Sequence, residues 1–323
     1  MAFDGFANVW TPVCFSKSLS ATGPLHREVA GERIVLFRTP AGVGALMDAC
    51  PHRGASLARG TVTAQGNLRC GMHGWVFNGA GDCLEVPWNN VSPSTRRRLA
   101  ARSLPVVEAG ELIWLFTGLR ADAPPVIPEL LCDPRPSRQH LAQLWPVHWT
   151  RVIENLLDPT HVGFVHPSTV GRGPLRQALK GSQLRMRRHE HKDGFMLSWE
   201  TSDSKSEFQG LYWTPPNGWQ HRVPNQSKFT AQMVWAVPVS RIETLVLFVA
   251  LRPRSQRWPY RFLLNTVDRL VLHEDRRAIE SQSPGPIEEA IHELNVPTDV
   301  GSLAFRDWYN KHCASSSAMM GPG

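Results

Sequence analysis

The strongest pattern in the sequence is CPHRGASL at residues 50–57, followed by CGMHGWVF at residues 70–77. Each segment offers one thiolate and one imidazole, and seventeen residues separate the two pairs. The four candidate ligands are Cys50, His52, Cys70 and His73. Thiolate and imidazole are ligands of zinc and of iron in proteins. The sequence therefore predicts a metal site with mixed ligands that two loops present.

Zinc is one candidate for this site, because it accepts two cysteines together with two histidines. In the usual zinc modules, however, one arm supplies both cysteines and the other both histidines. Here each arm is mixed, as in a Rieske 2Fe–2S cluster, where two cysteines bind one iron and two histidines bind the other. Pro51 and the glycines at positions 54, 71 and 74 allow tight loops with backbone N–H groups turned toward the cluster sulfurs. The pattern favours a Rieske cluster.

A second pair of candidate ligands, His161 and His166, stands near Asp158. Two histidines with a carboxylate suggest a facial triad for non-haem Fe(II), although a histidine pair alone also fits ordinary surface or core residues. Asp158 and His161 are three residues apart and share a helix face. His161 and His166 are five apart, about 500° of rotation, and do not share one on an ideal helix. Gly163 and Pro167 permit a distorted or ending helix, which would let both imidazoles converge.

The residue pattern changes along the chain and indicates two domains. Residues 1–120 contain short β-like runs between glycines and prolines, and Ala30-Gly31-Glu32 predicts a hairpin turn. These runs are Arg33–Arg38, Val43–Asp48, Leu104–Val107 and Leu112–Phe116. We expect a small antiparallel β domain at 1–120, a proline-rich linker at 121–145, a second domain at 146–313 and a flexible tail at 314–323.

The sequence of the second domain predicts a run of strands with helices before and after it. Helical spacing covers Val152–Phe164 and Trp258–Glu280, Pro286 opens a short helix, and Thr298 or Asp299 caps a last helix that reaches about His312. The predicted strands are Leu184–Arg188, Phe195–Thr201, Phe208–Trp213, Phe229–Val237 and Ile242–Leu251. This order predicts an α+β layer with helices on one face of a curved antiparallel sheet.

Charge and composition narrow the class of protein. The formal net charge is +7, but the densest basic run, residues 96–98, is only three long and no nucleic-acid motif accompanies it. An acidic redox partner therefore fits the charge better than DNA or RNA. The first twenty residues show no secretory signal, and the longest apolar stretch, Leu245–Leu251, is far short of a membrane span. We expect a cytoplasmic protein whose six cysteines form no disulfide framework.

Together the two motifs resemble those of the Rieske non-haem iron oxygenases. Residues 50–57 and 70–77 are similar to the cluster motif of the bacterial enzymes, and Asn155, Asp158, His161 and His166 match the family's Asn-x2-Asp-x2-His-x4-His spacing. The resemblance covers nearly the whole chain, and the length suits the single-subunit type, such as the vanillate and dicamba O-demethylases. It implies an N-terminal Rieske domain and a C-terminal helix-grip domain.

The resemblance also implies roles for further residues. The third iron ligand in the family is an aspartate of a late helix, which points to Asp275, with Glu274 and Asp268 as competing candidates. Asp158 would be the carboxylate that connects the two metal sites, between His73 of one chain and His161 of its neighbour in a homotrimer. Asn155 would lie beside the iron. A solvated, charged helix face is the alternative interpretation of residues 274–282.

The activity that the resemblance implies is O2-dependent hydroxylation or O-/N-demethylation. The cofactors would be the 2Fe–2S cluster and a mononuclear Fe(II). Electrons would come from NAD(P)H through a separate reductase, with or without a ferredoxin, because the chain lacks a Gly-x-Gly-x-x-Gly fingerprint. The alternatives are a Rieske electron-transfer protein with a non-catalytic second domain, a zinc-stabilised binding protein and, among enzymes, a ring dioxygenase or desaturase.

The aromatic residues of the second domain suggest a ring compound as substrate. They would line an apolar pocket, although each of them is also a natural member of the sheet's core. The segment Trp213–Trp219 contains two prolines and a glycine and predicts a loop that covers this pocket. We expect Trp213 and Trp219 to contact the substrate.

Overall fold

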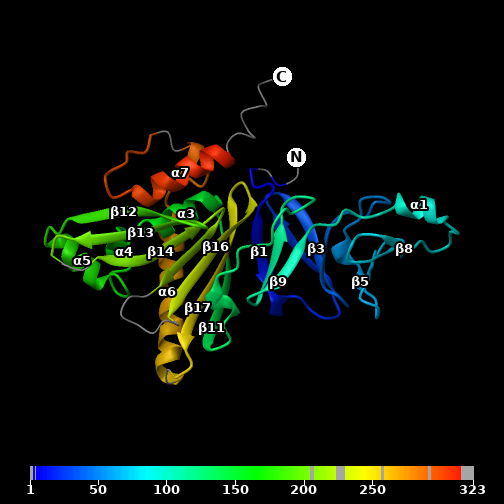
Figure 1. The fold of residues 1–323 in the computed structure, drawn as a ribbon, viewed down its shortest axis with the longest axis horizontal. Helices are drawn as coiled ribbons and strands as arrows, with labels where there is room; N and C mark the ends of the chain where they lie inside the picture. The colour runs from blue at the N-terminus through cyan, green and yellow to red at the C-terminus, as the bar shows by residue number, and fades with distance from the viewer. Residues whose placement is uncertain are drawn as a thin grey trace. The chain divides into compact units, whose positions relative to one another are not determined.

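The computed structural model describes residues 3, 5–203, 207–222, 230–255, 258–289 and 292–313. The chain divides into two compact units, Met1–Cys132 and Asp133–Gly323. Figure 1 shows the strands of both units and the helices of the second. Within the described residues, no helix combines the length and the apolar character that a membrane crossing requires.

The first unit is built from three small antiparallel sheets, with strand orders β1-β10-β9, β2-β3-β4 and β5-β6-β7-β8. Its strands are β1 (Trp10–Phe15), β2 (Leu25–Val29), β3 (Glu32–Thr39), β4 (Gly42–Met47), β5 (Thr61–Val62), β6 (Leu68–Arg69), β7 (Val76–Phe77), β8 (Cys83–Glu85), β9 (Val106–Ala109) and β10 (Leu112–Phe116). Its helices are α1 (Pro93–Arg97), α2 (Glu129–Cys132) and the 3-10 turns Ser16–Ser18 and Leu57–Arg59.

The predicted β2-β3 hairpin is confirmed. Val29 pairs with Glu32 across a two-residue turn, and Ala30 and Gly31 have φ angles of 47° and 78°. Positive φ at both central residues is what a type I′ turn requires, and glycine accepts it without strain.

The second unit is a seven-stranded antiparallel sheet with the order β11-β17-β16-β15-β14-β13-β12. Its strands are β11 (Pro136–Trp145), β12 (Leu184–His191), β13 (Gly194–Thr201), β14 (Phe208–Thr214), β15 (Gly218–Arg222), β16 (Ala231–Ser240) and β17 (Glu243–Pro253). Its helices are α3 (Trp149–Leu157), α4 (Val162–Val165), α5 (Arg172–Leu179), α6 (Trp258–Glu280), α7 (Val300–His312) and the 3-10 turn Ile287–Glu289.

Helices α6 and α7 cover the same face of this sheet. The register places Gln232 of β16 opposite His221 of β15, and His221 opposite Leu211 of β14. Trp213, two residues further on, has its side chain on the same face. The Gln232 amide bonds to Asp268 of α6, while the Trp213 ring packs against α7. The predicted α+β class, with helices on one face of an antiparallel sheet, is confirmed.

Three elements differ from the sequence expectations. The helix expected over Val152–Phe164 is two helices, α3 and α4, with a break between them. Residues 136–145 of the expected linker form β11, a full partner of β17. The expected loop between Trp213 and Trp219 is the tight turn of the β14-β15 hairpin. Phe229, the expected start of a strand, and the expected tail at 314–323 lie outside the described residues.

Candidate metal centres and substrate cavity

The four candidate cluster ligands lie on two loops of the first unit, one after β4 and one after β6. Cys50 and Cys70 belong to the buried core of the unit, whereas His52 and His73 are exposed. The Nδ1 atoms of the two imidazoles lie 3.2 Å apart. Trp75 stacks on His52, with 4.6 Å between the ring centroids. Two thiols inside and two imidazoles at the surface fit a group that needs sulfur on one side and nitrogen on the other.

The two loops have the same backbone design. The amide of Gly54 donates to the carbonyl of Cys50 at 2.8 Å, and the amide of Gly74 donates to that of Cys70 at 3.0 Å. The φ angles of these glycines are 69° and 74°, a region that residues with a β-carbon rarely adopt. Each loop therefore needs its glycine in order to bring its cysteine and histidine to the same point.

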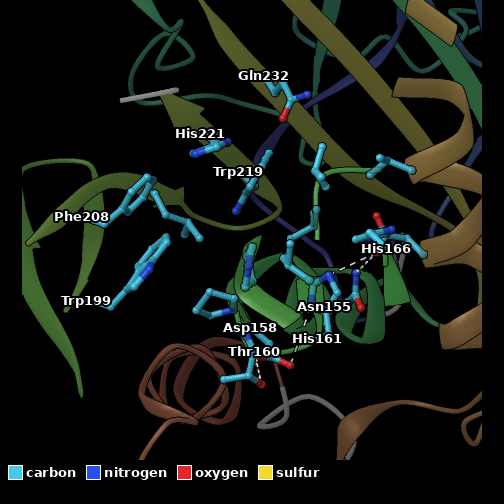
Figure 2. Close-up of a pocket in the computed structure, with 18 of the residues that line it drawn as sticks. Asn155, Asp158, Thr160, His161, His166, Trp199, Phe208, Trp219, His221 and Gln232 are labelled. Carbon is cyan, nitrogen blue, oxygen red and sulfur yellow. Dashed lines mark hydrogen bonds and ion pairs between the residues drawn. The ribbon is translucent and has the colours of Figure 1, made fainter. Parts of the chain in front are cut away.

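The break between α3 and α4 positions the second group of ligands. Asp158 has the extended φ and ψ angles of −104° and 102°, because the ring of Pro159 disfavours helical angles at the residue before it. The chain then turns, and the four-residue helix α4 starts after His161 and ends before His166. Both histidines consequently flank α4 instead of lying on one helix face. In Figure 2, Asp158, Thr160 and His161 lie together at one side of a cavity.

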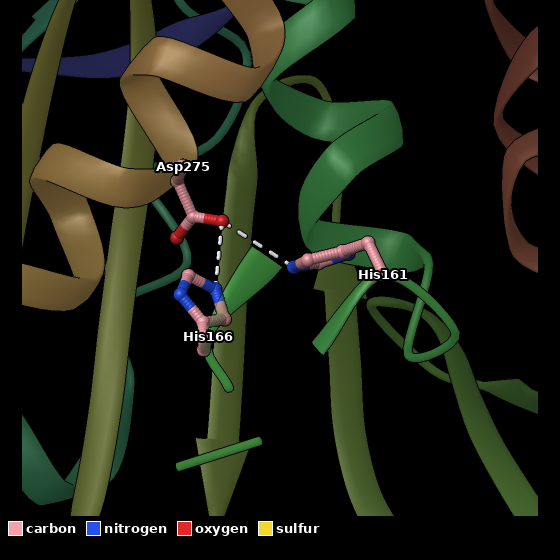
Figure 3. Close-up of side chains that lie close together, drawn as sticks. All are labelled: His161, His166 and Asp275. Carbon is pink, nitrogen blue, oxygen red and sulfur yellow. Dashed lines mark hydrogen bonds and ion pairs between the residues drawn. The ribbon is translucent and has the colours of Figure 1, made fainter. Parts of the chain in front are cut away.

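His161, His166 and Asp275 form a second group of candidate metal ligands, with ligand atoms all within 4.8 Å of one another. Nε2 of His161 lies 3.3 Å and Nε2 of His166 lies 3.1 Å from the same oxygen, Oδ1 of Asp275. The imidazole rings are 5.5 Å apart and inclined at 73°. Figure 3 shows Asp275 reaching down from α6 between the two rings. This is the donor set of a 2-His-1-carboxylate iron site.

The charges of these side chains depend on one another. Burial raises the pKa of Asp275, but the bonds from His161 and His166 outweigh it and hold this pKa at about 2. Burial lowers the pKa of His161, whereas Asp158 and Asp275 raise it to about 9. His161, His166 and Asp275 therefore stabilise one another's charges. A divalent cation in place of the histidine protons would also balance the charge of the carboxylate.

Other polar side chains support this site. Nδ1 of His166 lies 2.8 Å from Oε2 of Glu274, and the Asn155 amide donates to Oδ1 of Asp275 at 3.0 Å. Asp158 accepts hydrogen bonds from Thr160, and one of its oxygens lies 3.8 Å from Nδ1 of His161. Asn155 and Asp158 thus lie beside the candidate ligands. The contact of Glu274 with His166 has no signal in a single sequence.

Asp268, a competing candidate ligand, is engaged elsewhere. It is buried and pairs with Arg252, and it is not a member of the ligand group. Asp268 and Asp275 are two helical turns apart, so they share the inner face of α6 but not a site.

A cavity of about 790 Å3 lies between the sheet and the helices and reaches the ligand group. Aromatic residues form part of its wall: Trp199, Phe208 and Trp219 line it, and the rings of Trp199 and Phe208 stack at 3.9 Å. Trp219 therefore lies where a substrate contact was expected. Trp213 does not line the cavity, because α7 covers it, and its ring lies 5.2 Å from Trp308.

The two donor sets fit the two iron groups. Paired thiols and imidazoles suit a Rieske cluster, and two Nε2 atoms that converge with a carboxylate oxygen suit a mononuclear iron. Neither set includes the remaining cysteines, of which Cys14, Cys83 and Cys313 are buried.

Comparison with known families agrees with this interpretation. Residues 9–98 match the Rieske [2Fe-2S] domain, and residues 145–315, more than half of the chain, match the vanillate O-demethylase oxygenase C-terminal domain. Fold and sites define an iron–sulfur oxygenase component. The chain belongs to the Rieske non-haem iron oxygenases with a vanillate O-demethylase-type C-terminal domain. The cofactors of this family, a Rieske 2Fe–2S cluster and a non-haem iron that works with O2, are those that the sequence predicts.

Several curated relatives resemble part of the chain. The oxygenase component of dicamba O-demethylase from Stenotrophomonas maltophilia is 36% identical over 164 residues, 49% of this chain and 47% of that protein. The 3-chlorobenzoate-3,4-dioxygenase oxygenase subunit from Comamonas testosteroni is 33% identical over 164 residues, 49% of this chain and 37% of that protein. The chain thus spans less than half the length of these relatives. Their names describe the first as an oxygenase component and the second as an oxygenase subunit.

Solved structures show the same fold over nearly the full chain. Dicamba monooxygenase bound to dicamba superposes with a TM-score of 0.78 at 21% identity, covering 98% of this chain and 100% of that one. A mutant of NdmA from Pseudomonas putida CBB5 with theobromine gives a TM-score of 0.78 at 24% identity, covering 96% and 92%.

Proposed function

We propose that this chain is the terminal oxygenase of a multicomponent Rieske system that hydroxylates or demethylates a small aromatic or polycyclic compound. The observation that carries the proposal is the convergence of His161, His166 and Asp275 at a cavity with an aromatic wall. A separate NAD(P)H reductase, with or without a ferredoxin, would supply the electrons. A cytoplasmic location stays a prediction.

The net reaction balances with two electrons. For a methyl ether, R–O–CH3, O2, two electrons and two protons give R–OH, formaldehyde and water; for a hydroxylation, R–H, O2, two electrons and two protons give R–OH and water. When bound, the cluster transfers electrons one at a time and the mononuclear iron activates O2.

The residues of the chain hold and orient these groups. Cys50, Cys70, His52 and His73 would bind the cluster, and His161, His166 and Asp275 would bind the iron. Glu274 and Asn155 fix the orientation of two of the iron ligands. The stacked Trp199 and Phe208 present an apolar surface to a substrate ring, and an occupied cavity excludes water from the reacting atoms.

Iron and sulfide analysis tests the proposal. Anaerobically purified protein should contain about three irons and two acid-labile sulfides per chain, with a Rieske-type EPR signal after reduction. Asp275→Ala should lose one iron and keep the EPR signal. Two irons in the wild type, not increased by added Fe(II), would leave only an electron carrier, and a colourless zinc protein would overturn both sites.

A homotrimer is part of the proposal. His73 is exposed on the first unit, and the side chains of Asp158 and His161 are 32% and 16% exposed on the second. These groups are therefore accessible to a neighbouring subunit. A carboxylate that meets an imidazole on either side would orient both rings and connect the cluster of one subunit to the iron of the next.

A further inference from the structure

The sheet wall of the cavity carries polar groups that the proposed reaction does not use. Thr201, His221 and Gln232 line the cavity from β13, β15 and β16. Figure 2 shows His221 and Gln232 on the sheet, across the cavity from Asn155 and His161. If the chain has the proposed function, these polar groups face the substrate and can select one of its substituents.

The hydrogen bonds behind this wall fix which atoms donate and which accept. The Arg252 guanidinium, buried and always charged, pairs with Oδ2 of Asp268. Oδ1 of the same carboxylate accepts a hydrogen bond of 3.0 Å from the amide nitrogen of Gln232. An ionised carboxylate only accepts, so it fixes which end of the Gln232 amide faces it. The amide oxygen of Gln232 is then left for the other side, where Figure 2 shows it turned toward His221.

His221 is the next member of this chain of hydrogen bonds. Its ring lies between Phe208 and Trp219, with centroids at 5.7 and 5.8 Å. Burial lowers the pKa of His221, and its hydrogen bond with Gln232 opposes this effect only in part, so the ring is neutral at pH 7. A neutral imidazole that donates its one N–H to the Gln232 oxygen has a second nitrogen without hydrogen. The wall therefore presents a hydrogen-bond acceptor.

Charge at the wall disfavours an anionic substrate group. Among the described residues that line the cavity, the only arginine or lysine is Arg252. Its guanidinium is committed to Asp268, Gln139 and Asn265. A substrate carboxylate beside His221 would face the lone pair of the imidazole nitrogen and no free cation. The free energy lost when the carboxylate leaves water would then not be regained.

The spacing along α6 gives a scale for the cavity. Asp268, behind the acceptor wall, and Asp275, at the iron ligands, are seven residues apart, which is about 10 Å of helix axis. Both line the same cavity. Two fused aromatic rings with a substituent at each end are comparable in length with this separation.

We propose that His221 is a specificity-determining residue that selects neutral, bicyclic-sized aromatic substrates with a hydroxyl or N–H donor at the end remote from the reacting carbon. Gln232 acts through His221 as a positioning residue, because it holds the tautomer that accepts.

Three probes of one shape test this: 6-methoxy-2-naphthol, 2,6-dimethoxynaphthalene and 6-methoxy-2-naphthoate. Each has a methyl ether at one end and, at the other, a donor, an acceptor or a carboxylate. Dissociation constants are measured by calorimetry on the iron-loaded full chain without reductant, so that nothing turns over. The naphthol should bind at least about ten-fold more tightly than the other two, since either leaves the buried acceptor unpaired.

Variants separate hydrogen bonding from size. His221→Phe keeps an aromatic ring between Phe208 and Trp219 but removes the acceptor, so the preference for the naphthol over the dimethoxy compound should fall to within about two-fold. Gln232→Met removes the amide that fixes the tautomer of His221 and should therefore reduce the same preference. This second variant also tests the inference if His221→Phe does not fold. The control is His191→Phe, at an exposed position of β12, which should leave the preference unchanged.

Several outcomes overturn the inference. They are no binding of the naphthol, equal binding of the three probes by the wild type, or a preference that both cavity variants retain. Each leaves the proposed function standing if iron analysis finds the third iron. Loss of that iron in the wild type contradicts the proposed function instead.

Discussion

Neighbouring residues at the iron site have different tasks. Asp275 reaches Nε2 of His166, and Glu274, one position earlier on α6, reaches Nδ1 of the same ring. A ring held at both nitrogens has one orientation and one tautomer. A fixed tautomer and orientation make the imidazole a stronger metal ligand. Thr169 also lies 3.3 Å from the Glu274 carboxylate, so this arrangement has a third support.

We therefore expect Glu274→Ala to weaken binding of the mononuclear iron roughly 10- to 100-fold while the cluster keeps its spectrum. The measurement is iron retained against a graded chelator, read beside the EPR signal of the reduced cluster. Glu280→Ala is the matched control, because Glu280 is an exposed residue of the same helix that pairs with Arg276. Equal iron loss in the two variants would show that Glu274 has no role in positioning His166.

At this scale the sequence is informative wherever a short motif contains the ligand. Cys50, His52, Cys70 and His73 were predicted because each of two short segments contains one cysteine and one histidine. His221 and Gln232 were not predicted as a pair, because only the register of β15 and β16 brings them together. One polar residue in a strand is no signal until its partner across the sheet is known.

At the scale of elements, α3 depends on the residue that starts it. His148 is the N-cap, and its ring accepts a hydrogen bond from the Thr150 amide. Burial, together with the charges of Arg241 and Arg151, lowers the pKa of His148 to about 3. The folded protein thus holds this ring neutral where the unfolded chain would protonate it.

The sign of the pH dependence follows. Below the unfolded pKa of 6.5 and down to about 3, the unfolded chain binds one more proton than the folded one, so stability falls with falling pH in this window. We expect His148→Asn, which still caps the helix, to reduce the loss of unfolding free energy between pH 7 and pH 5 by about 2 kcal/mol.

Urea unfolding of wild type and variant at both pH values measures this difference. His191→Asn, at an exposed position, is the control and should keep the wild-type slope. A slope unchanged by His148→Asn would mean that His148 is protonated in the folded protein.

Element boundaries show where pattern reasoning stops. The long helix α6 and the strands β3, β4, β10, β13 and β17 follow their hydrophobic runs, and the sequence predicted them. The break after α3 has a local cause in Pro159. It was not predicted, because the apolar residues on both sides of Pro159 continue the spacing of a single helix. Strand β15 was missed because its residues Gln220, His221 and Arg222 are polar; pairing on both sides, not β propensity, makes it a strand.

At the scale of the whole molecule, the homotrimer proposal predicts activity from two inactive chains. His73→Ala removes a cluster ligand, and Asp275→Ala removes an iron ligand. If electrons pass between subunits, a mixed trimer places an intact cluster beside an intact iron. In trimers that contain both kinds of chain, about one third of the wild-type activity per chain should be restored, because one of the three neighbouring pairs in such a ring combines an intact cluster with an intact iron.

The experiment uses co-expressed variants with different tags, purified through both. Light scattering should give a mass of about three chains of 36.1 kDa. Product formation from an aromatic methyl ether that the wild-type system converts is the readout. Each variant alone should be inactive, and so should a mixture of separately assembled trimers that do not exchange subunits.

The position of Asp158 gives the matched control. Its carboxylate lies 3.8 Å from His161 of the same chain, so it belongs to the subunit whose iron is used. Asp158→Asn should abolish the restored activity when placed in the His73→Ala chain and should have little effect in the Asp275→Ala chain, whose own iron site is not used. No restoration at all would place electron transfer within one chain. Equal effects of Asp158→Asn in both chains would remove the reason for assigning Asp158 to the connection between subunits.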